Sequence, residues 1–338
     1  MRISDRQTAR DYLKYLDKAK TNYAETNARI ASGNRFTSIS DDVSAATKAL
    51  RVRVEKAKSE EYYGNVKAVN EQLSTTENAL TSINGVLSGA HSKVLAAMNS
   101  TSGESGRAAI ANEIGSVRDE ILQFANTKYN DAFVLGGSSA GKAPFSTDSS
   151  GNLLYNGIDV NIIEKDSAGY YYMDGADRKE IPMNGDTYVD IGLGITMSGS
   201  IVRSDTAMKT SYSGLEILGF GKDADGNPNN VFNMLTKLKD SIKNYDAETV
   251  GNYDDKLVSF TTNFRGYLTD IGAKTSFLDT IEKRVSTTID TYQSQISRLV
   301  GVNDAEEATN QSMNDYVLKA VLSMGSKIIP TSLMDFLN

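Results

Sequence analysis

The stretch that decides the fold is residues 66–97, which read VKAVNEQLSTTENALTSINGVLSGAHSKVLAA. Its apolar and small residues recur in alternating steps of three and four, and an average of 3.5 residues keeps one stripe of a helix facing a partner. At 1.5 Å per residue the stretch predicts a helix about 48 Å long. Such a helix buries only one stripe, so it must pair with another helix. The stripe consists of Val66, Val69, Leu73, Thr76, Leu80, Ile83, Leu87, Ala90, Val94 and Ala97.

Similar spacing recurs on both sides of the middle of the chain, over residues 110–124, 231–245 and 257–271 and towards both ends. The runs near the ends predict apolar seams that only other helices, of this chain or of other chains, can bury. The N-terminal seam contains Tyr12, Leu16, Ala19, Tyr23 and Ile30, with Thr26 among them. The C-terminal seam contains Leu278, Ile281, Val285, Tyr292 and Leu299.

The middle of the chain has a different composition. Residues 136–228 hold 15 of the 27 glycines and three of the four prolines, which predicts turns and short strands there. Alternating residues predict strands over 158–162, 188–191 and 195–197. We therefore predict a mainly α fold with an inserted β domain. Both termini build a long antiparallel, coiled-coil-like helical rod, and the β-rich head sits at the tip of the bundle.

Helix signals mark the boundaries between these parts. Residues 4–7 form a capping-box pattern that predicts the start of the first helix, and residues 32–34 (Ser-Gly-Asn) predict its end. Ser40, Asp41 and Asp42 can cap the second helix. We expect three domains. They are a terminal helical assembly domain (1–42 with 286–338), an α-helical rod (43–135 with 229–285) and an inserted variable β domain (136–228).

Composition excludes several kinds of chemistry. The chain of 338 residues has no cysteine and one histidine, so it has no disulfide and no cluster of imidazoles to hold a metal. Its net charge is −7, and acidic residues interrupt the basic N-terminal face, which argues against nucleic-acid binding. No apolar segment is long enough to span a membrane or to form a Sec-type signal, which by itself predicts a cytosolic protein.

The short motifs predict no enzyme. Residues 136–142 (GGSSAGK) resemble a phosphate loop, a nucleophile elbow and an acyl-enzyme motif, but Ala143 replaces the phosphate-loop hydroxyl and His91 precedes the serine. Residues 223–227 resemble a calcium loop, yet Pro228 stands where glycine is needed. His91 is predicted to flank the helical seam. We expect no catalytic residue, no cofactor and no metal, with an enzyme using residues 136–142 as the rival hypothesis.

Motifs at both ends of the chain resemble a known family. The sequence opens Met-Arg-Ile-Ser at residues 1–4, and residues 133–157 read like a passage into a β domain. With the other motifs, they resemble the hook-associated protein 3 family of the bacterial flagellum, which shares its helical ends with flagellin. The motif residues are Ser32, Gly33, Arg35, Ser40, Asp41 and Asp42, and the C-terminal signature contains Leu333, Asp335, Phe336 and Leu337, shortly after Pro330.

This resemblance implies a structural adaptor of the extracellular flagellum. It implies secretion by the flagellar export apparatus, which uses no Sec-type signal, with the help of an export chaperone. It also implies that both terminal helical segments order as a coaxial tube on assembly, a coupled folding and binding event. The implied partners are the first hook-associated protein, flagellin and identical subunits in a ring, but neither nucleic acid nor a membrane. The alternative is that the chain is itself flagellin.

Overall fold

The computed structural model describes residues 2–36, 38–98, 103–137, 142–167, 169–181, 187–192, 194–199, 201–203 and 207–328. The contacts of the chain divide it into two compact units. Unit 1 comprises Met1–Glu60 and Ser286–Asn338, and unit 2 comprises Glu61–Val285. Two long helices, α2 (Val43–Met98) and α6 (Ala247–Val300), contribute residues to both units.

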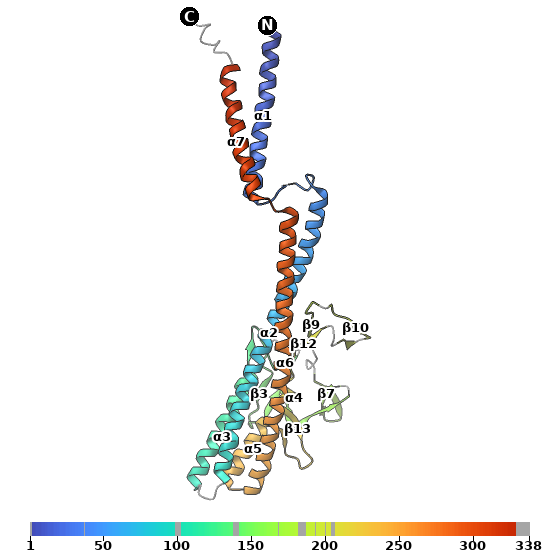
Figure 1. Ribbon diagram of the computed structural model, residues 1–338. Helices are drawn as coiled ribbons and strands as arrows, with labels where there is room; N and C mark the ends of the chain where they lie inside the picture. The colour runs from blue at the N-terminus through green and yellow to red at the C-terminus, as the bar shows by residue number, and fades with distance from the viewer. Residues whose placement is uncertain are drawn as a thin grey trace. The chain divides into compact units, whose positions relative to one another are not determined.

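In unit 1, helices α1 (Arg2–Ser32) and α7 (Asp304–Ile328) lie side by side and antiparallel (Figure 1). Helix α1 ends at Ser32 as predicted, because Gly33 adopts the left-handed conformation with a φ of 67°. Its start differs from the prediction, since the helix begins at Arg2 rather than at a cap on Ser4. Each residue added to an existing helix gains a backbone hydrogen bond, which outweighs the local capping preference.

Unit 2 is built around a helical bundle of α2, α3 (Glu104–Ala125), α5 (Val231–Asn244) and α6. All ten predicted stripe positions of α2 between Val66 and Ala97 are buried, each with at most 4% of its surface exposed. Helix α3 packs against α5, and α5 ends where Tyr245 takes a left-handed φ of 56°. The 3.5-residue pattern thus predicted the buried face of the longest helix correctly.

The predicted stripe of α6 holds for only part of the helix. Leu278, Ile281 and Val285 are buried, but further along the buried residues are Ile296 and Val300 rather than Tyr292 and Leu299. A straight helix with 3.6 residues per turn moves away from a 3.5-residue repeat by about 20° per heptad. The buried face of α6 therefore shifts by one position beyond Val285.

The middle of the chain forms short antiparallel strands in small sheets of two or three strands. The predicted strand over 158–162 is largely wrong. Only Ile158 and Asp159 are extended, and a 3₁₀ turn (Val160–Ile162) follows because the Asp159 side chain accepts a hydrogen bond from the Asn161 N–H.

The two-stranded sheets are β1 (Lys128–Tyr129) with β2 (Ala132–Phe133), β9 (Tyr188–Val189) with β12 (Met208–Lys209), β10 (Met197–Ser198) with β11 (Ile201–Val202), and β13 (Gly219–Lys222) with β14 (Pro228–Asn230). The three-stranded sheets are β3 (Phe145–Thr147), β4 (Leu153–Tyr155) and β5 (Ile158–Asp159), and β6 (Ile163–Asp166), β7 (Gly169–Asp174) and β8 (Asp177–Glu180).

The strands lie alongside the bundle rather than at its tip, which corrects the predicted position of the β region. Tyr129 donates to Glu71 of α2 at 2.7 Å, and Tyr212 donates to Asp270 of α6 at 2.7 Å. Tyr212 lies two residues before the short helix α4 (Gly214–Leu218), whose Glu216 carbonyl accepts from Tyr267 of α6. These contacts with α2 and α6 lie along the flank of the bundle (Figure 1). The mainly α fold with small sheets in its middle is confirmed.

The sheets are anchored to the bundle through buried contacts. Phe145 and Tyr155 pack with ring centroids 5.2 Å apart, and both are almost fully buried. The Asn126 amide both donates to and accepts from the backbone of Phe145, so it continues the edge of β3 as a strand would. Burial raises the pKa of Tyr155 to about 12. No helix in the part of the chain described here is long and apolar enough to cross a membrane.

Candidate assembly interface

The predicted N-terminal seam faces α7, but α7 covers it only in part. Ala19 is buried, whereas Tyr12, Leu16 and Tyr23 are half-buried and Ile30 is 38% exposed. A single partner helix cannot cover an apolar stripe that spans more than about 100° of a helix surface. Part of the seam therefore remains open to a further partner.

The residues predicted for C-terminal assembly fall into three groups. Leu278, Ile281 and Val285 are buried in unit 2, so their surfaces are already used within the chain. Tyr292 and Leu299 belong to unit 1 and are half-buried. The signature residues Leu333, Asp335, Phe336 and Leu337, with Pro330, lie outside the described residues.

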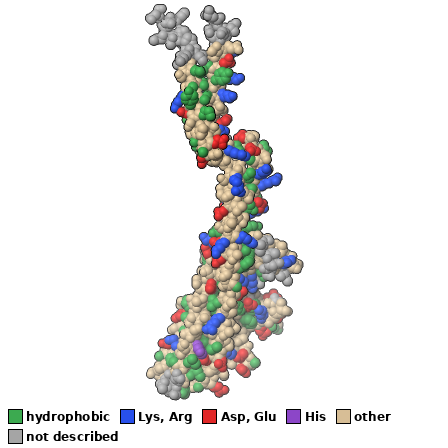
Figure 2. All heavy atoms as spheres, in the orientation of Figure 1, with side chains coloured by type: hydrophobic (Ala, Val, Ile, Leu, Met, Phe, Trp, Pro, Cys, Tyr) green, Lys and Arg blue, Asp and Glu red, His purple; other side chains and the backbone are tan. Residues whose placement is uncertain are grey.

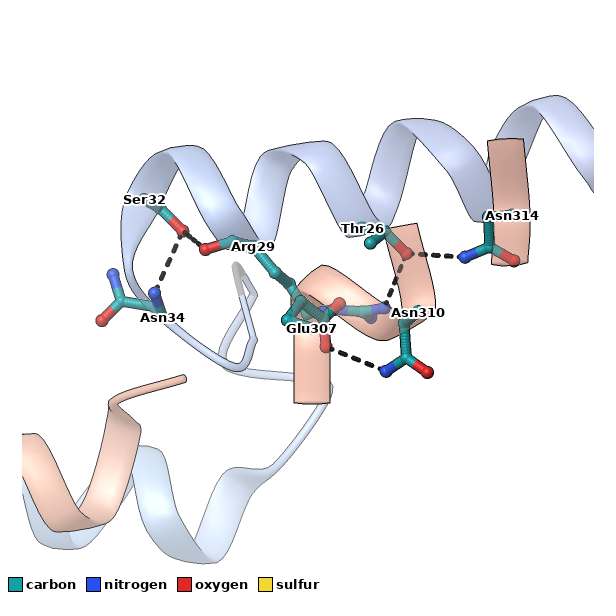
Figure 3. A network of polar contacts seen from close by, with 7 residues as sticks. All are labelled: Thr26, Arg29, Ser32, Asn34, Glu307, Asn310 and Asn314. Carbon is teal, nitrogen blue, oxygen red and sulfur yellow. Dashed lines mark hydrogen bonds and ion pairs between the residues drawn. The ribbon is translucent and has the colours of Figure 1, made fainter. Parts of the chain in front are cut away.

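A group of polar side chains crosses the seam between α1 and α7 (Figure 3). Thr26 is fully buried, and its hydroxyl accepts from Asn314 at 2.8 Å and from Arg29 at 3.3 Å. Glu307, which is 7% exposed, accepts from Arg29 at 2.6 Å and from Asn310 at 3.2 Å. We call these five residues the polar cluster. Gln311 and Asn27 form a further hydrogen bond of 2.8 Å across the same two helices.

The polar cluster stabilises the buried carboxylate of Glu307 in its charged form. Burial by itself raises the pKa of Glu307, but the hydrogen bonds from Arg29 and Asn310 and the charge of Arg29 together lower it, so the pKa lies below its ordinary value. Polar groups in an apolar seam specify how two helices align, because any slip leaves them buried without partners. The sequence offered one signal of this cluster, a threonine at a seam position.

The motif residues fold into the connection between α1 and α2. Ser32 donates to the Arg29 carbonyl and accepts from the Asn34 N–H, which closes the end of α1 (Figure 3). Asp42 caps α2 by accepting from the Ala45 N–H at 2.9 Å, and it forms an ion pair with Arg35 at 2.8 Å.

Nearby hydroxyl and carboxylate groups complete this connection. Asp41 accepts from the Ser38 N–H at 3.0 Å, and the hydroxyl groups of Ser38 and Ser40 lie 2.7 Å apart. Every motif residue that the resemblance pointed to is thus within one connection of about ten residues. These contacts fix the course of the backbone between α1 and α2.

The two connections of unit 1 are joined to each other. The Arg35 N–H donates to the Val300 carbonyl at 2.9 Å, and the Val302 N–H donates to the Gly33 carbonyl at 3.0 Å. Asn34 and Gly301 thereby form an isolated antiparallel bridge. The chain therefore leaves α1 and enters α7 through two backbone segments that are hydrogen-bonded side by side.

An open groove runs between α1 and α7, and we call it the α1–α7 groove. It has a volume of about 430 Å³ and a mainly apolar lining. Tyr15 is 64% exposed and Met324 is 59% exposed, and Figure 2 shows hydrophobic side chains gathered on this helix pair. The lining residues are Thr8, Asp11, Tyr12, Tyr15, Lys18, Ala19, Asn22, Val317, Val321 and Met324.

The other sequence motifs have structural surroundings of their own. The glycine-rich stretch 136–142 is described only in part, because residues 138–141 lie outside the described residues. The element that follows it is strand β3, whereas a phosphate loop is followed by a helix. Asp223 accepts from two backbone N–H groups of its own turn and pairs with Lys256 at 2.5 Å. His91 lies 2.6 Å from Asp254, a carboxylate of α6. Among the described residues, no group of acidic or histidine side chains has the arrangement of a metal site.

The amino-acid sequence is similar to known flagellar proteins. Residues 3–140 match the family model of the bacterial flagellin N-terminal helical region. Flagellar hook-associated protein 3 of Salmonella typhimurium is 25% identical over 170 residues, which cover 50% of this chain and 53% of the relative. The Escherichia coli protein of the same name is 25% identical over 149 residues, 44% of this chain and 47% of the relative. The chain spans about half the length of the curated relatives it matches.

Two solved structures share the fold. A flagellar hook-associated protein from Vibrio parahaemolyticus has a TM-score of 0.58 and 20% identity, covering 77% of this chain and 100% of that chain. Bacillus cereus FlgL has a TM-score of 0.50 and 18% identity, covering 73% of this chain and 99% of that one. The long helices and the small central sheets share the fold of these structures, and residues 3–140 are similar to the flagellin N-terminal helical region.

The curated relatives to which the chain is similar are both flagellar hook-associated protein 3. The resemblance inferred from the motifs at the ends of the sequence is therefore confirmed.

Proposed function

We propose that this chain is a structural adaptor that joins the hook side of a bacterial flagellum to the flagellin filament. One observation carries the proposal. Of the 21 large apolar side chains that are exposed among the described residues, 12 belong to unit 1, which holds about a third of the chain. Exposed apolar surface concentrated in one region is typical of an interaction site.

The partners follow from the class of protein and from this surface. Unit 1 would pack against identical subunits in a ring, against the first hook-associated protein on one side and against flagellin on the other. Its partly covered seam supplies the apolar stripe that such neighbours bury. The chain would reach its extracellular site through the flagellar export apparatus, with an export chaperone covering the apolar surface before assembly. This role needs neither a catalytic centre nor a cofactor.

The alternative is flagellin itself, because flagellin shares the N-terminal helical region. Abundance distinguishes the two functions. A junction protein occurs in a fixed, small amount per flagellum, whereas the amount of filament protein rises with filament length. We expect the amount of this chain in sheared flagella to stay constant as filaments grow. An amount that rises with filament length would contradict the adaptor role.

A deletion strain tests the adaptor role directly. Without this chain we expect complete hooks with no filaments and flagellin secreted as monomers, because nothing bridges the two. Electron microscopy and the flagellin content of the medium measure both results. Filaments of normal number in the deletion strain would overturn the proposal.

Single substitutions on the two units provide a matched comparison. Tyr15→Asp in unit 1 places a charge in the α1–α7 groove, and Met197→Asp places one on a residue of the β region that is 54% exposed. We expect Tyr15→Asp to reduce the number of filaments per cell at least tenfold and Met197→Asp to leave it unchanged. Equal effects of the two substitutions would show that unit 1 is not the assembling surface.

A further inference from the structure

A polar cavity lies in unit 2, between α6 and the segment that runs from β12 into α4. Its volume is about 600 Å³, within the range of about 300–1,000 Å³ that small-molecule sites occupy. Helix α6 contributes Tyr267, Asp270 and Lys274, whose spacing of three and four residues places them on one face. The opposite wall contains Lys209 of β12 and Glu216 of α4.

The carboxylate of Asp270 has one oxygen to spare. Its Oδ2 accepts from the Tyr212 hydroxyl at 2.7 Å and from Lys274 at 2.9 Å, whereas its Oδ1 has no hydrogen-bond donor among the described residues. Burial raises the pKa of Asp270, but the hydrogen bonds from Lys274 and Tyr212 and the charges of Lys274 and Lys209 outweigh it, so the pKa lies below its ordinary value. Asp270 is therefore charged, and its Oδ1 can accept a hydrogen bond from a ligand.

Glu216 on the opposite wall repeats this arrangement. Its Oε1 accepts from Lys165 at 2.8 Å and from the Tyr170 hydroxyl at 2.7 Å, and its Oε2 has no donor in the part of the chain that the structure describes. Burial raises the pKa of Glu216 as well, but the hydrogen bonds from Lys165 and Tyr170 and the charges of Lys165 and Lys209 hold it below its ordinary value. Each wall of the cavity thus carries one charged carboxylate with a spare acceptor oxygen.

The remaining groups of the cavity select a neutral ligand that is rich in hydroxyl groups. Lys209 and Lys274 balance the two carboxylates, so a ligand meets no net charge from the lining side chains. The spare oxygens only accept hydrogen bonds, whereas the Asn263 amide in the same lining can donate one, and a hydroxyl group can serve both. The half-buried Tyr267 donates to the Glu216 carbonyl at 3.4 Å, so its ring crosses from α6 towards α4. The negative face of such a ring attracts weakly positive C–H groups.

From the two spare oxygens, the balanced charge and the ring of Tyr267, we infer that this cavity binds a neutral hexose, either free or at the end of a glycan. One sugar hydroxyl donates to Oδ1 of Asp270 and another to Oε2 of Glu216, while a C–H face of the sugar lies on Tyr267. The cavity belongs to unit 2 and the proposed assembly surface to unit 1, so sugar binding is independent of the proposed function.

Nuclear magnetic resonance titration of the full free chain tests this site. The probes are glucose, galactose, mannose and the disaccharides maltose and lactose, each hexose being compared with its amine and its uronic acid. We expect at least one neutral sugar to shift the amide signals around Glu216 and Asp270, with a dissociation constant in the millimolar range. The charged forms of that sugar should bind severalfold more weakly. Tighter binding of the disaccharide would identify the end of a glycan as the ligand, and equal binding would identify the free sugar.

Substitutions separate contact with the sugar from support of the fold. Asp270→Asn leaves the amide oxygen to Tyr212 and Lys274 and puts an N–H₂ donor where the spare acceptor was, so binding should weaken about tenfold. The matched control is Asp279→Asn on the same helix, whose exposed carboxylate bonds to Asn70 at 3.0 Å and which should leave the affinity unchanged.

Tyr267 and Glu216 supply a second, independent set of variants. Tyr267→Phe should keep the affinity, because the ring remains, whereas Tyr267→Leu should lower it severalfold. Glu216→Gln should weaken binding as Asp270→Asn does, which keeps the test decisive if one of the two variants fails to fold.

Several results would overturn the site. They are the absence of binding by every neutral sugar in the millimolar range, tighter binding of the amine or the uronic acid, and equal losses in Asp270→Asn and Asp279→Asn. An unchanged affinity in Tyr267→Leu would contradict the contact with the ring. Filament attachment is scored separately, so sugar binding can fail while the proposed function stands.

Discussion

Thr26 shows how much a single polar residue contributes to the alignment of two helices. Its hydroxyl has no access to water and accepts from Asn314 of α7 and from Arg29 of its own helix. Sliding α1 past α7 by one turn would separate Thr26 from Asn314 and Glu307 from Arg29, leaving buried polar groups unpaired. An unpaired buried polar group costs about 1–3 kcal/mol, and a charged one costs more. The polar cluster therefore selects one register for a seam whose small and apolar residues tolerate several.

The lowered pKa of Glu307 makes the α1–α7 pair sensitive to acid. A carboxylate whose pKa is lower in the folded state than in the unfolded state contributes stability above its unfolded pKa and loses it as the pH falls through the folded pKa. We expect amide protection in α1 and α7 to fall as the pH drops below about 4.5, the ordinary range of glutamate. Glu307→Gln should reduce protection at pH 7 and flatten its dependence on pH. Hydrogen exchange measures both, and an unchanged pH dependence in this variant would contradict the role of Glu307.

At the scale of the helices, two helical glycines, Gly325 buried against α1 and Gly89 exposed, should respond to alanine in opposite ways. A Cβ added at Gly325 of α7 would lie 2.0 Å from the Tyr12 hydroxyl oxygen, whereas one added at Gly89 of α2 meets nothing within 4 Å. Alanine stabilises a helix interior by about 1 kcal/mol relative to glycine, but overpacking costs about 1–3 kcal/mol. Gly89→Ala should therefore stabilise its helix. Gly325→Ala should loosen the contact between α1 and α7.

Hydrogen exchange of each helix separates these two effects. Protection in α2 should rise in Gly89→Ala, and protection in α1 should fall in Gly325→Ala even though the substitution lies on α7. An increase in α1 protection would show that Tyr12 moves aside without cost and that its contact with Gly325 contributes little to the pair.

The sequence predicted elements better than it predicted their surroundings. The buried face of α2 follows from local spacing alone, because each position depends only on the rotation of the helix. The buried face of α6 beyond Val285 does not follow from local spacing, because its shift along the helix depends on which helix lies beside it. The flank position of the β region and the pairing of Arg29 with Glu307, 278 residues apart, depend on tertiary contacts that no local pattern encodes. The sequence did not predict the α1–α7 groove either, although two of the residues that line it, Tyr12 and Ala19, belong to the predicted N-terminal seam.

At the scale of the whole molecule, the two units should differ in stability. The stripe of α2 in unit 2 is fully buried, while the seam of α1 in unit 1 is half-buried, so unit 1 gains less from burial of apolar surface. We expect limited proteolysis of the free chain to remove residues from unit 1 first and to leave a fragment close to Glu61–Val285. Mass spectrometry identifies the fragment. Initial cleavage within α3 or α5 would contradict this order.

The paired connections of unit 1 have a mechanical consequence. A single strand between two helical segments turns freely about its own axis, whereas two strands tied by hydrogen bonds from Arg35 to Val300 and from Val302 to Gly33 must wind around each other when twisted. Bending the paired connections distorts few hydrogen bonds, but twisting them strains both backbone segments. The two connections therefore resist twisting more than bending, so that α1 and α7 turn together when the connections are twisted.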